Sequence, residues 1–283
     1  MKQYSDNPKS IKYHVKKYLL KNKKQYFEKT IVDLPAGNGV TSKLLLEMGA
    51  NPIPFDLFPE YFTDNRIECK RVDITEGIPM ENKIADFAIC QEGIEHFTDQ
   101  FNALKEFNRI LKQNGSLIIT TPNYSNLRAR LSYFLCESER FCSMMPPNEI
   151  DSIWMNNEQV SDKIYFGHVF LLGIQKLRVM ARLAGFKIKY IQPTRLKTTS
   201  LIILIFTYPF IFISNYISYL KNINKDKGYD KKYQKEVYKE IFKLSINFRL
   251  LVDSHLFVVF EKEKDSENVF KELKSVHKEF GLT

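Results

Sequence analysis

Between residues 30 and 123, short apolar runs rich in β-branched residues alternate with segments of helical periodicity. Strands are predicted at 30–34, 52–56, 69–74, 85–91 and 116–123, and helices at 42–48 and 102–112. Such alternation indicates an α/β fold with a mainly parallel sheet. A later helix at 174–186 and strands at 187–193 and 255–263 extend the prediction to seven strands.

The rest of the chain decorates this core, and its 283 residues suit one domain better than two equal ones. We predict an N-terminal amphipathic helix within 1–27, a core at 28–198 with a substrate cap at 124–168, an apolar and basic helical insertion at 199–250 between strands six and seven, and a last strand with a C-terminal helix at 251–283. The formal net charge of +9 favours anionic partners. The N-terminal segment lacks the apolar stretch of a secretory signal, which predicts a cytoplasmic location.

The turn after the first predicted strand reads Asp33-Leu34-Pro35-Ala36-Gly37-Asn38-Gly39. Open α/β sheets bind ligands beyond the carboxyl ends of their strands, and glycines let the backbone approach a ligand closely. Asp56 ends the second strand, where a carboxylate can accept hydrogen bonds from ribose hydroxyls, and Asp73 ends the third strand. Acidic residues at three successive strand ends indicate a nucleoside-bearing cofactor.

The order DLPAGNG, FD, VDI, ADFAICQEGIEHF and ILKQNGSLIITTPN resembles class I S-adenosylmethionine (SAM) dependent methyltransferases. The resemblance is to the branch that holds ubiquinone-pathway O-methyltransferases and envelope-sugar methyltransferases. It covers residues 28–123 and, more loosely, 166–193 and 255–262. It implies a Rossmann-like seven-stranded sheet and an enzyme that uses SAM.

The resemblance also assigns cofactor residues: Asp33, Pro35, Ala36, Gly37, Asn38 and Gly39 around the methionine part, Asp56 and Leu57 at the ribose, Asp73 and Ile74 at the adenine, and Gln91 on the other side. Pro35 replaces the family's first glycine, which removes an N–H donor and stiffens the turn.

Two other hypotheses are a nicotinamide oxidoreductase and a SAM-fold protein that acts as a membrane-bound scaffold without catalysis. The first needs a third glycine at position 42, where Ser42 stands.

Glu92, Glu95 and His96 follow the fourth strand. If they begin a helix, they share one face, and with His168 they suit a divalent cation such as Mg²⁺ or Mn²⁺. The pattern resembles the metal-binding set of small-RNA 2′-O-methyltransferases and of some ubiquinone-pathway enzymes, which implies a metal that grips substrate hydroxyls. The alternative is a solvated helix start with His96 as a lone general base. We name His96, His168 and Glu95 as catalytic candidates and expect His14, His255 and His277 to be structural or surface residues.

Residues 198–220 form an uninterrupted run of uncharged residues, long enough to span a membrane. A single crossing would separate strand 255–263 from its sheet, and Pro209 with Asn215 favours a broken or re-entrant segment. Residues 221–250 follow with nine Lys/Arg against four Asp/Glu, a net of +5. We predict an interfacial anchor on anionic lipid. The alternatives are a homodimer interface, an extra core helix or a transmembrane hairpin.

The function predicted is O-methylation of a hydroxyl on a membrane- or envelope-associated acceptor: a glycan, a lipid or a quinone-like precursor. We expect the substrate to be a small molecule or a molecule linked to lipid or glycan. With an acceptor in the membrane, we expect the protein to lie on the inner face of the cell membrane. The alternative is metal-dependent 2′-O-methylation of RNA. Nucleic acid is not the expected partner, because the basic excess lies beside an apolar run without interleaved aromatic residues.

Overall fold

The computed structural model describes residues 6–138, 145–155 and 164–277. Its main sheet has the strand order β3-β2-β1-β4-β5-β9-β8. The strands are β1 Thr30–Asp33, β2 Asn51–Asp56, β3 Lys70–Arg71, β4 Ala85–Gln91, β5 Leu111–Pro122, β8 Phe186–Ile191 and β9 His255–Lys262. Only β9 runs antiparallel to its neighbours among these seven. The predicted seven-stranded, mainly parallel sheet is confirmed.

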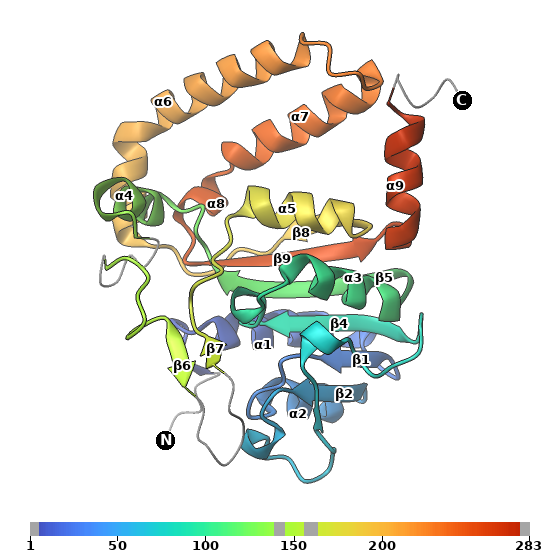
Figure 1. Cartoon of the computed structure of the whole chain (residues 1–283). Coiled ribbons are helices and arrows are strands. Elements are labelled where there is room, and N and C mark those ends of the chain that lie inside the picture. The colour runs from blue at the N-terminus through green and yellow to red at the C-terminus, as the bar shows by residue number, and fades with distance from the viewer. Residues whose placement is uncertain (1–5, 139–144, 156–163, 278–283) are drawn as a thin grey trace.

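Helices cover both faces of the sheet because its strands are apolar on both sides. The helices α1 Ile11–Lys21 and α2 Val40–Glu47 pack on one face, and α3 Gln100–Ile110 and α5 Ile174–Leu183 on the other (Figure 1). Alternate residues of each central strand enter the two cores: Ile118 faces α1 and α2, whereas Leu117 and Ile119 face α3 and α5. This three-layer arrangement is the one that the alternation predicted.

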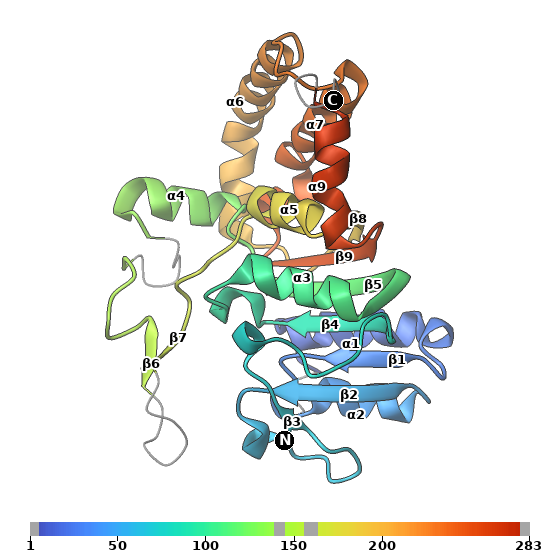
Figure 2. The ribbon, with the colours of Figure 1, turned by 45° about the vertical axis from the view of Figure 1, so that its right-hand side comes forward.

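The carboxyl ends of β1, β2, β4 and β5 meet at one edge of the sheet, and antiparallel β9 begins there, with His255 opposite Pro122. The helix α4 Leu127–Cys136 and the ribbon of β6 Ile153–Met155 and β7 Ile164–Phe166 lie beyond this edge (Figure 2). They belong to the predicted substrate cap. Residues 139–144 and 156–163 of that cap lie outside the described residues.

Short 3₁₀ helices connect the larger elements: η2 Lys23–Gln25, η3 Pro59–Tyr61, η4 Ile74–Glu76 and η5 Ile94–His96. The predicted C-terminal helix is α9 Ser266–Ser275.

The insertion contains α6 Thr198–Ile223, α7 Lys231–Ser245 and α8 Phe248–Val252. The first two form a hairpin that projects from the core (Figure 2). The predicted break at Pro209 is wrong, because α6 continues through this proline and bends along its length (Figure 1). A proline removes one backbone hydrogen bond, and neighbouring turns can hold the helix together around it. The extra-core-helix alternative is also wrong, since only 11% of the most apolar window of α6 is buried.

Candidate active site

A cavity of about 470 Å³ lies beyond the carboxyl ends of β1, β2 and β4. Its lining includes the predicted cofactor residues Pro35, Asp56, Leu57, Asp73 and Ile74, and it reaches Glu92 and His96. Phe58, Phe97, Tyr165 and Phe166 add aromatic walls. Apolar walls with a few polar groups at fixed positions are typical of small-molecule sites. These aromatic residues were not predicted from the sequence, because they come from three separate segments: the loop after β2, the loop after η5, and strand β7.

A smaller cavity of about 200 Å³ shares Pro35 and Glu92 with the larger one. It is lined by the predicted residues Ala36, Gly37, Asn38 and Gln91, and Thr41 donates a hydrogen bond to Gln91. Lys12 of α1 also lines it, which the sequence analysis missed. Apart from Asp33 and Gly39, every residue that the resemblance assigned to the cofactor lines one of these two cavities.

Asp56 fastens the turn after β1 to the end of β2. The N–H of Gly37 donates to its Oδ2 at 2.7 Å, and the N–H of Phe58 donates to its Oδ1 at 2.8 Å. Gly37 adopts a φ of +54°, the left-handed region that favours glycine. Each carboxylate oxygen keeps a second lone pair, so further donors can bind. Asp56 therefore shapes the loop, and its contact with a ribose remains a prediction.

Pro35 is accommodated by a glycine on the neighbouring loop. A Cβ atom at Gly93 would lie 2.2 Å from Cδ of Pro35. The proline at position 35, where the family has glycine, therefore requires a glycine at position 93.

Asp33, the last residue of β1, lines neither cavity and is 1% exposed. The hydroxyl of Ser42 donates a hydrogen bond of 2.6 Å to its Oδ2. Burial, with a contribution from the charge of Asp56, raises the pKa of Asp33 to about 7. Ser42 occupies the position of the third glycine in a dinucleotide fingerprint, and here its hydroxyl is the partner of a buried carboxyl group.

The segment after β4 is not the helical turn that the sequence predicted. Glu92 has a φ of +50°, and η5 covers only Ile94–His96. A left-handed residue cannot belong to a right-handed helical turn, so Glu92 does not share a helix face with Glu95 and His96. A non-glycine residue in this conformation is a local strain of the kind found at functional sites.

His96 is held as a neutral base. Its Nδ1 lies 3.1 Å from the carbonyl oxygen of Phe166 and 3.0 Å from that of Gly167. Since carbonyl oxygens only accept, Nδ1 carries the hydrogen and donates it, which leaves the lone pair of a neutral ring on Nε2. Burial lowers the pKa of His96 below its ordinary value of 6.5.

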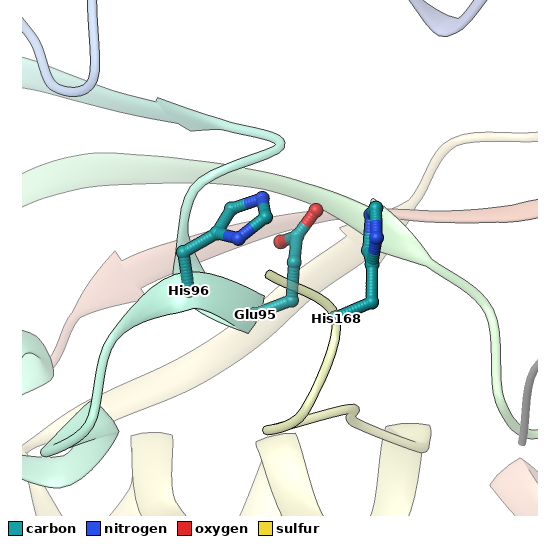
Figure 3. A group of neighbouring side chains, drawn as sticks. All are labelled: Glu95, His96 and His168. Atoms are coloured by element: carbon teal, nitrogen blue, oxygen red, sulfur yellow. The ribbon is translucent and has the colours of Figure 1, made fainter. Parts of the chain in front are cut away.

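Glu95, His96 and His168 form a cluster whose potential ligand atoms all lie within 4.8 Å of one another. The carboxylate of Glu95 lies between the two imidazole rings (Figure 3), whose centroids are 5.2 Å apart. Gln100 of α3 holds the two loops together by donating to the carbonyl oxygens of Ile94 and Phe170. The tertiary structure therefore unites three of the four predicted metal ligands.

The chemistry of this cluster fits a divalent cation. Glu95 is fully buried, and neither of its carboxylate oxygens has a hydrogen-bond partner among the residues that the structure describes. Burial and then the charge of Glu92 raise the pKa of Glu95 to about 8. A cation would satisfy these oxygens and favour the ionised carboxylate. One carboxylate with two imidazoles suits Mn²⁺ better than Mg²⁺, which prefers oxygen ligands.

The fourth predicted ligand, Glu92, faces a different residue. Its Oε2 lies 3.3 Å from Nε2 of His255, and the hydroxyl of Ser254 lies 2.9 Å from Nδ1 of the same ring. His255 was expected to be a structural or surface residue. Its position depends on β9 running antiparallel, which brings the first residue of the strand to the carboxyl ends of the parallel strands, and the sequence did not predict that direction.

A family described as a methyltransferase domain matches residues 11–190. The chain is similar to the ubiquinone biosynthesis O-methyltransferase of Aliivibrio fischeri, with 23% identity over 143 residues, 47% of this chain and 60% of that protein. It is also similar to the mitochondrial enzyme of the same description from Homo sapiens, with 28% identity over 128 residues, 41% of this chain and 34% of that protein. The matched regions thus span less than two thirds of these curated relatives.

Two solved structures share the fold. One is a SAM dependent methyltransferase from Archaeoglobus fulgidus, with a TM-score of 0.50 and 14% identity, covering 88% of this chain and 94% of that one. The other is the YcgJ protein from Bacillus subtilis, with a TM-score of 0.50 and 15% identity, covering 89% of this chain and 99% of that one.

Proposed function

The chain belongs to the methyltransferase domain family, and from this premise we propose that it transfers the methyl group of SAM to a hydroxyl oxygen of an acceptor. One observation carries the proposal: the larger cavity extends from Asp56 and Asp73 at the strand ends to Glu92 and His96. The residues predicted to bind the nucleoside and a neutral base therefore line one cavity, which supports methyl transfer to oxygen.

When bound, SAM supplies a methyl group on a positively charged sulfur. The transfer breaks the S–CH₃ bond, whose electron pair stays on sulfur, and forms the C–O bond to the acceptor. In the metal-free form the hydroxyl proton passes to Nε2 of His96, because Nδ1 already carries a hydrogen that the carbonyls of Phe166 and Gly167 hold. Such a positioned base contributes about 10²- to 10⁴-fold to the rate.

We further propose that Glu95, His96 and His168 hold a divalent cation in the active protein. A cation there would bind the acceptor hydroxyl and lower its pKa. In that form His96 would be a ligand through Nε2, and Glu92, which lines the cavity beside His255, would be the base that remains.

We propose an acceptor that is a membrane- or envelope-associated glycan, lipid or quinone-like precursor. Two observations support this class. The curated relatives are described as ubiquinone biosynthesis O-methyltransferases. In addition, α4, beyond the active edge, exposes the apolar side chains of Leu131, Tyr133, Phe134 and Leu135.

The test begins with calorimetric titration of SAM into the purified protein. Release of S-adenosylhomocysteine is then measured with a simple catechol, with a polar lipid extract and with a single-stranded RNA, each with and without Mn²⁺. Turnover on the catechol or the lipid extract supports the proposal. Turnover on RNA alone selects the 2′-O-methylation alternative, and SAM binding without turnover on any acceptor selects a non-catalytic role.

A further inference from the structure

The insertion carries a surface that the methyl-transfer chemistry does not use. Nine large apolar side chains of α6 are each at least 40% exposed: Ile202, Ile205, Phe206, Phe210, Phe212, Ile213, Tyr216, Ile217 and Leu220. They recur every three or four residues and lie on one half of the helix, since each residue advances about 100°. We call this the α6 stripe. Exposed apolar patches of this extent mark interaction sites.

Lysines gather beside the α6 stripe at the end of the hairpin. Residues 221–235, which we call the hairpin tip, contain Lys221, Lys225, Lys227, Lys231, Lys232 and Lys235, all exposed, against Asp226 and Asp230. Gln234 orders the tip by donating to the carbonyl oxygens of Asn222, Ile223 and Lys225 at the end of α6. The positive charge is therefore held at a fixed place relative to the apolar side chains.

The hairpin is fixed to the core, so the surface has a defined orientation. Arg178 of α5 forms a salt bridge of 2.7 Å with Glu240 of α7, and Gln175 donates to the carbonyl oxygen of Ile241. Phe242 of α7 contacts the rings of Phe212 and Tyr216, which form the edge of the α6 stripe next to α7. The rest of the stripe, with Phe206, Phe210 and Ile213 at its centre, is open to solvent.

A membrane-spanning arrangement conflicts with these positions. The N–H of Lys197 donates to the carbonyl oxygen of Val252, so the insertion leaves and re-enters the core at the same place. Both helices of the hairpin would have to cross, and α7 carries five lysines and two glutamates in its 15 residues. A lysine near the centre of a bilayer costs about 2.5–3.5 kcal/mol even by the most permissive scale.

We propose that the α6 stripe and the hairpin tip together dock the protein on an anionic lipid bilayer, with α6 lying along the interface. At about 1.5 Å per residue, the stripe from Ile202 to Leu220 extends about 27 Å along the helix. Lipid phosphates would attract the lysines of the hairpin tip, and acyl chains would cover the apolar side chains of the stripe. A second copy of the chain would cover the stripe but leave the lysines without anionic partners.

The docking surface starts on the same side of the sheet as the candidate active site. The first turn of α6 contacts the loop between β5 and α4, since Ser200 donates to Asn126 at 3.3 Å and Asn126 donates to the carbonyl oxygen of Asn123. The surface thus begins at the edge of the sheet that holds Glu92 and His255. Lipid binding itself needs neither SAM nor an acceptor, so its test is independent of the proposed function.

The test is co-sedimentation of the whole protein with vesicles of phosphatidylcholine, with and without phosphatidylglycerol, over a salt series. We expect binding to anionic vesicles that weakens with salt and persists in part at high salt. The triple variant Phe206→Ser, Phe210→Ser and Ile213→Ser should bind about tenfold or more weakly at every salt concentration. Phe270→Ser on α9, an equally exposed phenylalanine at 63%, is the matched control.

The charge contribution is tested with Lys225→Gln, Lys231→Gln and Lys232→Gln in one chain. Each lysine removed should weaken low-salt binding about fivefold, and the loss should vanish at high salt, where charges are screened. Lys23→Gln with Lys24→Gln, exposed lysines of η2, is the control. Because all substituted side chains are exposed, unchanged thermal unfolding should confirm that each variant folds.

Failure of the wild-type protein to bind anionic vesicles at low salt would overturn the proposal. So would equal binding by the triple serine variant. Sedimentation velocity without lipid tests whether a second copy of the chain covers the α6 stripe instead. A wild-type dimer that does not bind vesicles and that becomes a monomer in the triple serine variant would assign the stripe to a second copy.

Discussion

Replacing Asp33 by asparagine should make the protein more stable at neutral pH and should remove a defined part of its pH dependence. The carboxyl group is 1% exposed, and burial raises its pKa from 3.8 to about 7. Between these two pH values the folded state keeps a proton that the unfolded state has released. Stability is therefore lost as the pH rises through this window and stays at the lower value above it.

The size of the effect follows from the two pKa values. A rise from 3.8 to about 7 corresponds to about 4 kcal/mol between pH 4 and pH 8. Asparagine keeps an oxygen that can accept from Ser42, whose hydroxyl lies 2.6 Å from Oδ2 of Asp33. Its extra N–H₂ group adds a cost of about 1–3 kcal/mol if it stays unpaired. That cost does not depend on pH. The quantity to measure is therefore how the difference in unfolding free energy between Asp33→Asn and the wild-type protein changes with pH.

The assay is urea unfolding of both proteins at several pH values from 4 to 8, reported as the difference in unfolding free energy. Glu106→Gln is the control of opposite sign, because the hydrogen bonds from Arg109 hold the pKa of Glu106 below its usual range. The stability from Glu106 is present above its unfolded pKa and is lost as the pH falls. A difference for Asp33→Asn that stays constant with pH would refute the reasoning.

Three further predictions concern the cavity and the cluster. Asp56→Ala should weaken SAM binding by about 1–3 kcal/mol in calorimetry, because the backbone N–H groups of Gly37 and Phe58 lose their carboxylate acceptors; unchanged affinity would show that Asp56 is outside the cofactor site. If the cluster holds a metal, Mn²⁺ should raise the unfolding temperature of the chelator-treated protein. Glu95→Gln should abolish that rise, whereas Glu92→Gln should largely keep it. Full turnover in excess chelator would exclude the metal. In chelator, an NMR titration should show His96 ionising below pH 6.5, because burial lowers its pKa; a midpoint above 6.5, in a signal that His96→Gln removes, would contradict the assignment.

Local sequence patterns determined the order of strands and helices in the core of this protein. Apolar runs of β-branched residues specify strands, and the turn residues between them specify where the chain reverses, so the order of elements from 30 to 123 was readable without tertiary contacts. Parallel strands bring their carboxyl ends to one edge by necessity. For this reason Asp56 and Asp73, which lie far apart in sequence, could be assigned to one cavity in advance, and the structure places both in its lining.

The tertiary structure decided what depends on direction and on distant neighbours. The left-handed conformation of Glu92 separates it from Glu95 and turns it toward His255, more than 160 residues away. His168 reaches His96 because Gln100 holds the intervening loops. Likewise, composition marked 198–220 as apolar, but only the packing against α7 shows which part of α6 is covered. The structure also shows that the helix continues through Pro209. Side-chain identity fixes what a residue can bind, whereas the fold sets what lies within hydrogen-bonding distance of it.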